Sequence, residues 1–349
     1  MNRIVSTWRV NTKTTKLEHI NKFLPDDVFV VPGMVSEKIM HDWIKKYGTP
    51  AYIVMDQAGH IKINGLEIYS VPLRGLAFSF EKFEKLNLPR EVDTNFCFNF
   101  FIHENLNSNK YALIKLVEYF EFDCFTYILN TDKKFCRAQT LVRDLSTITD
   151  VDLLQDFRNK ILKPITLPHK HNKNYDQGAD AYIIHQWQNN LDLNFVQSAV
   201  SLISEPHGDL TASVFTEKTI FAIMGLTFPI FVGGVGNADY LKKVGLDVFD
   251  DIIDHSYQFL PTLAERCYYA LKNNIKILTD LNLAKQLRTK NLDRLLKNRD
   301  LLYTGILIDH VYQVVDSWPD TLKSVIKPYF EFIQKVQIGK SMRLYDYVD

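Results

Sequence analysis

The stretch VFTEKTIFAIMGLTFPIFVGGVG, residues Val214–Gly236, carries the pattern that decides the fold. Thr216 is a typical N-cap, and the apolar spacing after it predicts a helix over Glu217–Gly225. A short buried strand, Ile230–Val232, and a glycine-rich loop follow. A helix, a buried strand and a glycine loop in this order are typical of an α/β unit with a parallel sheet.

The same alternation extends along the rest of the chain. Short apolar runs predict strands at Ile4–Val10, Val28–Val31, Tyr52–Met55, Leu66–Val71, Phe96–Ile102, Phe125–Leu129 and Phe195–Ile203. Periodic segments predict helices at Glu37–Tyr47, Asn109–Phe120, Val151–Leu162, Ala181–Asn190, Asp239–Val244, Pro261–Asn273, Leu281–Leu302 and Leu322–Val336. Strands that alternate with helices predict βαβ units and parallel sheets.

One polar segment, Lys163–Asp180, separates two such patterns. Its sequence, KPITLPHKHNKNYDQGAD, contains two prolines and a glycine, and it is the best linker candidate. We expect an N-terminal lobe over residues 1–165 and a C-terminal lobe over residues 166–349, with the last helix able to pack back on the first lobe. The predicted fold class is therefore α/β, with two Rossmann-like lobes that face a cleft.

Composition limits the classes of partner. The 349 residues carry 41 acidic and 41 basic side chains, and this balance argues against tight nonspecific DNA binding. A local basic patch stays open, with candidates at Arg3, Arg9, Lys13 and Lys16. The cysteines lack Cys-x-x-Cys spacing, the N-terminus lacks a signal peptide, and the longest apolar run is too short for a membrane span. We expect a cytoplasmic protein without a membrane partner, in the host cytoplasm if the source is viral.

The tetrad Phe215-Thr216-Glu217-Lys218 is the best candidate for a ligand site. A helix N-terminus attracts phosphate, and Lys218 adds a mobile cation there. The carboxylate of Glu217 suits two neighbouring ribose hydroxyls. Together they fit the nucleoside diphosphate of a nucleotide sugar. The alternative is structural, because Thr216 and Glu217 are also what a helix start and its dipole favour.

The run Ser201–Tyr257 resembles the C-terminal signature of a glycosyltransferase family common in tailed phages. It is more distantly similar to the donor-binding segment of α-1,3-fucosyltransferases. The blocks that carry the likeness are Ser201-Leu202-Ile203-Ser204-Glu205, Phe215-Thr216-Glu217-Lys218-Thr219, Phe228-Pro229-Ile230-Phe231 with its glycine loop, Gly245-Leu246-Asp247-Val248-Phe249 and Asp254-His255-Ser256-Tyr257-Gln258. His255 and Gln258 depart from the family pattern, and the N-terminal half matches loosely, around Phe98–Tyr127.

The resemblance implies a phage-type glycosyltransferase of the two-lobed GT-B architecture. Glu217 would hold the ribose, and Thr216 and Lys218 would meet the diphosphate of a UDP- or GDP-sugar cosubstrate. Arg266, on a helix where related phage proteins often carry an arginine, would pair with phosphate or form a surface salt bridge. Gly233 and Gly234 allow either close backbone approach to the donor or a plain strand-to-helix turn.

Candidates for a catalytic base are expected in the N-terminal lobe, opposite the donor. His103 and Glu104 follow the strand Phe96–Ile102, and Asp56 follows the strand Tyr52–Met55. Solvation of loops is the alternative for all three. The one Asp-x-Asp, Asp150-Val151-Asp152, is interpreted as a helix cap rather than a metal site, so we expect no essential protein-bound metal site. We also expect no prosthetic group.

The predicted activity is transfer of a sugar from a nucleotide sugar to a hydroxyl acceptor. The favoured acceptor is a hydroxymethylated or hydroxylated pyrimidine in phage DNA, flipped out of double-stranded DNA for modification. A glycan, lipid or protein acceptor is the first alternative. A nonenzymatic nucleotide- or DNA-binding protein is the second.

Overall fold

The computed structural model describes residues 3–7, 15–31, 37–55, 66–71, 93–102, 108–129, 148, 150–156, 158–159, 196–205 and 216–339. The chain divides into two compact units, each with its own parallel β-sheet. The first unit takes Met1–Lys85, Tyr182–Gln186 and Leu302–Asp349, and the second takes Leu86–Ala181 and Trp187–Leu301. The predicted α/β class with two Rossmann-like units is confirmed.

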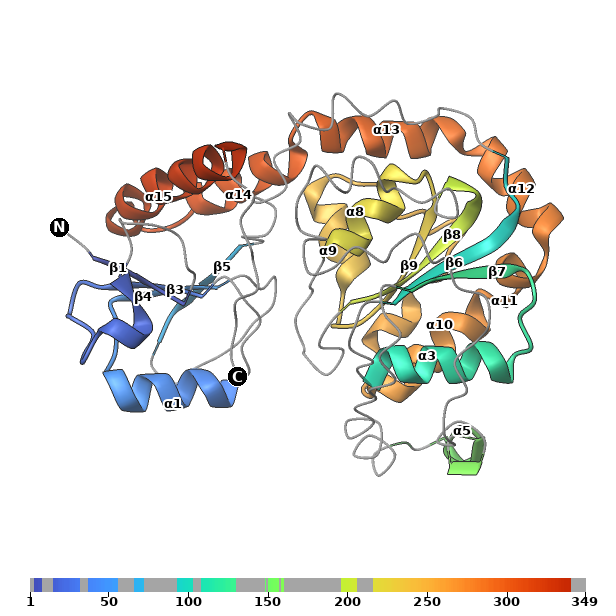
Figure 1. The fold of residues 1–349 in the computed structure, drawn as a ribbon, viewed down its shortest axis with the longest axis horizontal. Coiled ribbons are helices and arrows are strands. Elements are labelled where there is room, and N and C mark those ends of the chain that lie inside the picture. Colours follow the sequence, from blue (N-terminus) through green and yellow to red (C-terminus); the bar gives the residue numbers. More distant parts are fainter. Residues whose placement is uncertain are drawn as a thin grey trace. The chain divides into compact units, whose positions relative to one another are not determined.

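The first unit is built on a parallel sheet in the order β2-β1-β3-β4-β5. Its strands are β1 (Ile4–Ser6), β2 (Thr15–Lys16), β3 (Val28–Val31), β4 (Tyr52–Met55) and β5 (Ile68–Ser70). Alternate residues of β3 and β4 pack against α14 (Ile306–Asp316) and α15 (Asp320–Gly339), and the residues between them pack against α1 (Glu37–Tyr47) (Figure 1). Both faces are therefore buried, which explains the uninterrupted apolar runs of these strands.

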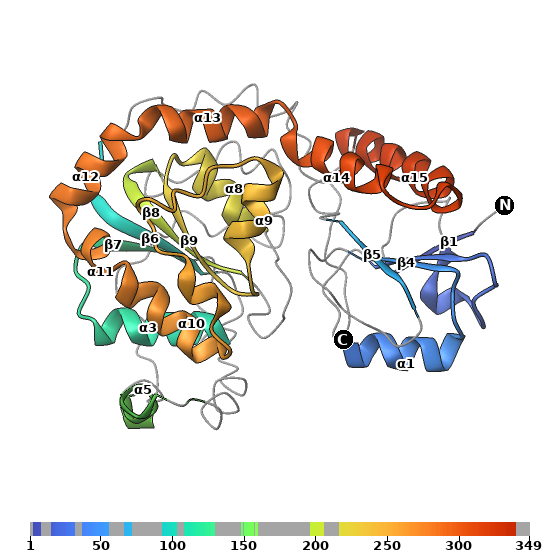
Figure 2. The same cartoon turned by 180° about the vertical axis from the view of Figure 1, so that it is seen from behind.

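The second unit holds a parallel sheet in the order β7-β6-β8-β9. Its strands are β6 (Phe96–Ile102), β7 (Phe125–Leu129), β8 (Ser198–Ser204) and β9 (Phe228–Val232). On one face lie α3 (Ser108–Tyr119) and α10 (Leu263–Asn273), and on the other lie α8 (Glu217–Met224) and α9 (Asn237–Val244), as the front and back views agree (Figure 1, Figure 2). This is a doubly wound sheet.

The strand order of this sheet reverses between β6 and β8. From β6 the chain passes through α3 to β7 on one side, and from β8 it passes through α8 to β9 on the other. Ligands of doubly wound sheets bind in the crevice at the carboxyl ends of the strands where the order reverses. The ends of β6 and β8, at Ile102 and Ser204, mark that place.

The remaining described helical elements are short 3₁₀ turns and α-helices, distributed over both units. They are η1 (Leu17–His19), η5 (Ser256–Phe259), α5 (Val151–Asp156), α11 (Ile275–Thr279), α12 (Leu281–Lys290) and α13 (Leu292–Tyr303). The single helix expected over Leu281–Leu302 is wrong, because the chain breaks at Asn291, which caps α12 with φ −109° and ψ 15°. Within the described residues, no helix combines the length and apolarity that crossing a bilayer requires.

The expected division at residues 165 and 166 does not match the two units. β6 pairs with β8, with Phe98 opposite Val200 and Phe100 opposite Leu202, so residues from 86 onward belong with the second sheet. β8 is buried along its whole length and needs a strand on each side. The last helix, α15, packs on β3 and β4. Lys163–Asp180 and Ala181–Asn190 lie outside the described residues.

Candidate functional site

A buried carboxylate marks the carboxyl end of β8. Glu205 follows directly after the strand and is fully buried. Its Oε1 accepts hydrogen bonds from the Thr216 main-chain N–H at 2.8 Å and from the Thr219 hydroxyl at 2.7 Å, and its Oε2 accepts one from the Thr216 hydroxyl at 2.5 Å. This one side chain therefore ties the end of β8 to the first turn of α8.

Two further contacts hold Glu205 in place. The Asn109 side chain, at the start of α3, donates to the Glu205 carbonyl at 2.6 Å and to the Val232 carbonyl at 3.4 Å. Gly233 packs so closely that a Cβ there would lie 2.9 Å from the Glu205 Cβ. The starts of two helices and the ends of two strands therefore meet around Glu205, and Gly233 is glycine because this contact leaves no room for a side chain.

Lys218 lies in the first turn of α8 and is only 5% exposed. Its Nζ donates to the Thr216 hydroxyl at 3.3 Å, while that oxygen also accepts the Lys218 main-chain N–H at 3.4 Å as the N-cap. Glu217 begins α8, and its side chain lies outside the described residues. The arrangement places a buried cation at a helix N-terminus, which is the charge that an anionic ligand requires.

The main-chain donors of this helix start are less available than the sequence indicates. Glu205 takes the N–H of Thr216, and the N–H groups of Thr219 and Ile220 donate to the Thr216 carbonyl. The ammonium of Lys218, rather than a row of free N–H groups, is therefore the main electrostatic attraction that α8 offers to a phosphate.

The glycine loop makes a strand-to-helix turn. Gly236 adopts the left-handed conformation with φ 76° directly before α9, and Gly234 is buried. At least one of the first N–H groups of α9 already has an acceptor within the protein, because the Gln258 Oε1 accepts the Ala238 N–H at 3.0 Å. Gln258, one of the two departures from the family pattern, therefore caps α9.

The block Asp254–Gln258 has structural contacts at most of its positions. The Tyr257 hydroxyl donates to the Phe231 carbonyl of β9 at 2.8 Å, and Asp254 Oδ1 accepts the Ser256 N–H at 2.8 Å. His255 bonds the Val248 carbonyl through Nε2 at 2.9 Å, and burial lowers the pKa of its imidazole below the ordinary value. Neutral His255 therefore donates a hydrogen bond from Nε2 to the Val248 carbonyl. Through Tyr257, the block is also hydrogen-bonded to β9, the outer strand of the sheet.

Arg266 is buried in the second unit. Its Nη1 donates to the carbonyls of Leu260 at 2.8 Å and Pro261 at 3.3 Å, just before α10 begins. The same helix start carries a reciprocal cap between Thr262 and Glu265. These contacts hold the entry into α10.

The Asp-x-Asp is a helix cap, as expected. Asp150 Oδ1 accepts the Leu153 N–H at 3.0 Å, and Oδ2 accepts the Tyr269 hydroxyl at 3.0 Å. These bonds, the Leu153 one first, lower the pKa of Asp150. The helix that it caps, α5, is described over Val151–Asp156. Residues 157 and 160–162 of the expected helix lie outside the described residues. Among the residues that the structure describes, no group of three or more His, Cys, Asp or Glu is placed to hold a metal ion.

The three candidate bases, Asp56, His103 and Glu104, lie outside the described residues. His103 and Glu104 do not belong to the N-terminal lobe in which a base was expected. They follow β6, which pairs with β8, so they belong to the same unit as Lys218 rather than to an opposing lobe. Asp56 follows β4 and belongs to the first unit.

Sequence reasoning did not select Glu205, Thr219 or Asn109 as site residues. A usable signal was present, since Glu205 ends an apolar strand and Thr216 and Thr219 are spaced as the first turn of the next helix. A carboxylate at a strand end can satisfy the donors of a helix start. Only the tertiary contact between the end of β8 and the start of α8 shows that Glu205 satisfies these donors.

No protein-family model matches the chain, and no curated protein sequence does either. Among solved structures, the chain is similar to the crystal structure of the pneumococcal O-GlcNAc transferase GtfA in complex with UDP and GlcNAc. The match covers 83% of this chain and 59% of that one, with 11% identity and a TM-score of 0.26. The chain thus corresponds to about three fifths of that protein, at a similarity too low to support an argument about function.

Proposed function

We propose that the second unit binds a nucleotide sugar at the carboxyl ends of β8 and β9 and that the protein is a glycosyltransferase. The observation that carries the proposal is Lys218, a lysine buried in the first turn of α8 at the end of a doubly wound sheet. A lysine in the first turn of a helix, beside the positive end of the helix dipole, favours an anionic ligand such as a diphosphate. The resemblance of the surrounding blocks to donor-binding segments supports the same assignment.

Each predicted donor-site residue has a role in binding the nucleotide sugar. Lys218 neutralises the charge that builds on the departing diphosphate, and Glu217 accepts hydrogen bonds from the ribose hydroxyls. Thr216 holds Lys218, and Gly233 and Gly234 let the backbone approach the donor. Arg266 contributes indirectly, through the carbonyls that it fixes before α10.

The transfer breaks the bond between the anomeric carbon and the diphosphate oxygen and forms a bond from that carbon to an acceptor oxygen. The acceptor proton passes to a base, for which Asp56, His103 and Glu104 are the candidates in an inverting reaction. The electron pair leaves with the diphosphate, which is where Lys218 lies in the proposal. The cosubstrate is a UDP- or GDP-sugar.

For the acceptor we favour a hydroxymethylated or hydroxylated pyrimidine of phage DNA, which rests on the resemblance to phage-type proteins. The basic residues expected near the N-terminus give it little support. Arg3 forms a two-point contact with Asp27, at 2.9 and 2.6 Å, and Lys16 pairs with Glu18 at 3.3 Å. Arg9 and Lys13 lie outside the described residues. A glycan, lipid or protein hydroxyl is the alternative acceptor.

Calorimetric titration with UDP and GDP tests the donor site. Lys218→Ala is expected to weaken binding by about 1.5–3 kcal/mol, the value of a hydrogen bond to a charged group. Lys285→Ala, at an exposed lysine of α12, is the matched control and should leave affinity unchanged. Equal nucleotide affinity in Lys218→Ala and the parent protein would place the site elsewhere.

Mass spectrometry of nucleosides digested from modified DNA, after incubation with a panel of nucleotide sugars, tests the transfer itself. A sugar mass increment on the modified pyrimidine, absent from unmodified DNA, supports the DNA acceptor. Transfer to a glycan, lipid or protein instead rejects DNA and keeps the enzyme. Tight nucleotide binding without transfer to any acceptor favours the nonenzymatic alternative.

A further inference from the structure

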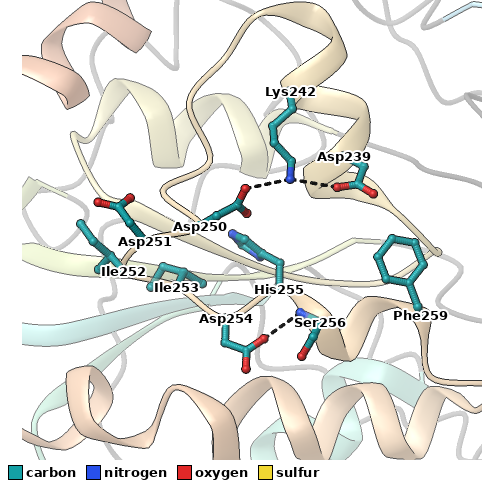
Figure 3. A pocket seen from close by; sticks show the side chains of 10 residues that line it. All are labelled: Asp239, Lys242, Asp250, Asp251, Ile252, Ile253, Asp254, His255, Ser256 and Phe259. Carbon is teal, nitrogen blue, oxygen red and sulfur yellow. Dashed lines mark hydrogen bonds and ion pairs between the residues drawn. The ribbon is translucent and has the colours of Figure 1, made fainter.

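A pocket of about 500 Å³ lies beside α9 (Figure 3). Asp239 and Lys242 come from the first two turns of α9, and the other lining residues come from Asp250–Phe259, in the connection to α10. None of Glu205, Thr216, Lys218 or Gly233 lines it. It therefore needs an explanation of its own.

Acidic side chains predominate among the charged residues that line the pocket. Four aspartates face one lysine, and that lysine is already used, because Lys242 Nζ lies 3.0 Å from Asp239 Oδ1 and 2.8 Å from Asp250 Oδ2. Figure 3 shows the ammonium between the two carboxylates. Arg294, outside the pocket, pairs with Asp251 at 2.8 Å. The carboxylates still outnumber the cations, so the pocket attracts positive charge and repels a nucleotide.

Asp254 is the lining carboxylate whose negative charge is least compensated by the contacts described. Its two oxygens take hydrogen bonds from neutral donors, the Ser256 N–H at 2.8 Å and the Asn273 amide at 3.1 Å. Neutral donors orient a carboxylate without cancelling its charge, so a cation in the pocket would gain an attraction that the described residues do not already satisfy.

His255 supplies a second and independent indication of a ligand. Its side chain lies among the residues that line the pocket, and the residue is only 8% exposed (Figure 3). Nε2 is engaged by the Val248 carbonyl at 2.9 Å, whereas Nδ1 has no hydrogen-bond partner among the described residues. With the proton on Nε2, Nδ1 is an acceptor, and a buried acceptor calls for a donor. The missing partner is therefore an N–H or O–H group.

Phe259 supplies an apolar contact at the same pocket. It is 58% exposed, unusual for a large aromatic side chain, and Figure 3 shows its ring on the side of the pocket away from Asp251. An exposed ring beside carboxylates can contact an alkyl chain with its face and attract a cation through its π electrons.

We infer that this pocket binds an organic ammonium group carried on an alkyl chain. The ammonium meets Asp250 and Asp254 and donates to His255 Nδ1, and the chain lies against Phe259. A free diamine and the side chain of a lysine on another protein offer the same chemistry. The inference does not depend on the proposed sugar transfer, and its test uses no nucleotide.

Binding is measured by calorimetry and by the ring ¹⁵N resonances of His255, with three probes of similar length. They are cadaverine, lysine blocked at both termini, and the neutral 1,5-pentanediol. Binding of cadaverine or blocked lysine, with a shift at Nδ1 and none with the diol, supports the inference. The tighter of the two ligands identifies the source. Equal binding of the diol, or no binding of either amine, overturns it.

Two variants and a control localise the binding. Phe259→Ala should weaken it about three- to fivefold, the size of an exposed cation–π contact. Asp250→Asn should weaken it on the order of tenfold, because it removes a charge and leaves Lys242 less compensated. Asp309→Asn makes the same charge change at an exposed site on α14 and should have no effect. Equal losses in Asp250→Asn and Asp309→Asn would show general attraction rather than a site.

Discussion

The carboxylate of Glu205 accepts both the main-chain N–H and the hydroxyl of Thr216, at 2.8 and 2.5 Å. The pair joins the end of β8 to the start of α8 and sets the position of Lys218 two residues later. A helix start is thus satisfied by an anion from the protein itself, in the place where a bound phosphate is often found. Any ligand that Lys218 attracts must lie beside this pair rather than replace it.

Replacing Thr216 by valine tests this pair. The variant keeps the shape of the side chain but removes the hydroxyl, which leaves Oε2 of a buried carboxylate without that donor. We expect the free energy of unfolding to fall by about 1–3 kcal/mol. Urea denaturation measures it, with Thr289→Val on the exposed side of α12 as the control. Equal stability of both variants would mean that Glu205 does not depend on this hydroxyl.

Gly233 and Gly305 should respond to alanine for different reasons. In Gly233→Ala the new Cβ meets the Glu205 Cβ at 2.9 Å, so overpacking should cost about 1–3 kcal/mol. A Cβ at Gly305 would have no atom within 4 Å beyond its chain neighbours, but φ is +85°, so alanine is strained by about 1 kcal/mol. Asparagine should recover part of the loss at Gly305 and none at Gly233. The denaturation midpoints of the alanine and asparagine variants at both positions test these expectations. A recovery of stability by asparagine at Gly233 would refute the packing explanation.

Arg288 closes the opposite end of α8. Its guanidinium donates to the carbonyls of Gly225 and Leu226, both at 3.0 Å, and to the Thr94 hydroxyl at 3.2 Å, while burial lowers its pKa to about 10. Arg288→Met should destabilise the second unit by about 1.5–3 kcal/mol, because these acceptors lose a charged donor. Lys285→Met on the same helix is the control. A neutral effect of Arg288→Met would show that water replaces the guanidinium.

His255 should make stability depend on pH. Burial depresses the pKa of its imidazole in the folded protein, so the unfolded chain binds the proton more readily below about pH 6.5. The free energy of unfolding should therefore fall as the pH drops from about 6.5 towards the folded pKa. In His255→Gln this part of the slope should disappear, so the parent loses its advantage as the solution becomes acidic. Urea titrations between pH 5 and 8 measure both slopes, and parallel slopes would contradict the prediction.

The two units predict which fragments fold. Residues 86–301 contain all four strands of the second sheet, and we expect this fragment to fold by itself. Residues 166–349 lack β6 and β7, and with them the fully buried Phe98 and Phe100, so this fragment should not fold. Circular dichroism and dispersion of amide NMR signals distinguish the outcomes. A folded 166–349 fragment would support the division expected from the sequence.

Local elements were readable from the sequence because their signals are local. The strands Val28–Val31 and Phe96–Ile102 and the helix Glu37–Tyr47 occur with the predicted bounds, since apolar runs and 3.6-residue spacing depend on near neighbours. Asp150 capping its helix was predicted for the same reason. Asn291 was missed because a break between two helices of similar composition leaves little mark on periodicity.

Which elements share a sheet was decided only by the tertiary structure. The sequence placed Phe96–Ile102 in the first lobe because a polar linker candidate follows it, yet β6 pairs with β8, about a hundred positions further along the chain. Buried strands have similar apolar sequences, and no local pattern predicts with which other strand each of them will pair. The site followed the same rule. Thr216 and Lys218 were readable as a helix start, whereas Glu205 became their partner only when β8 and α8 came together, because a hydrogen bond across 11 positions depends on where the chain folds back.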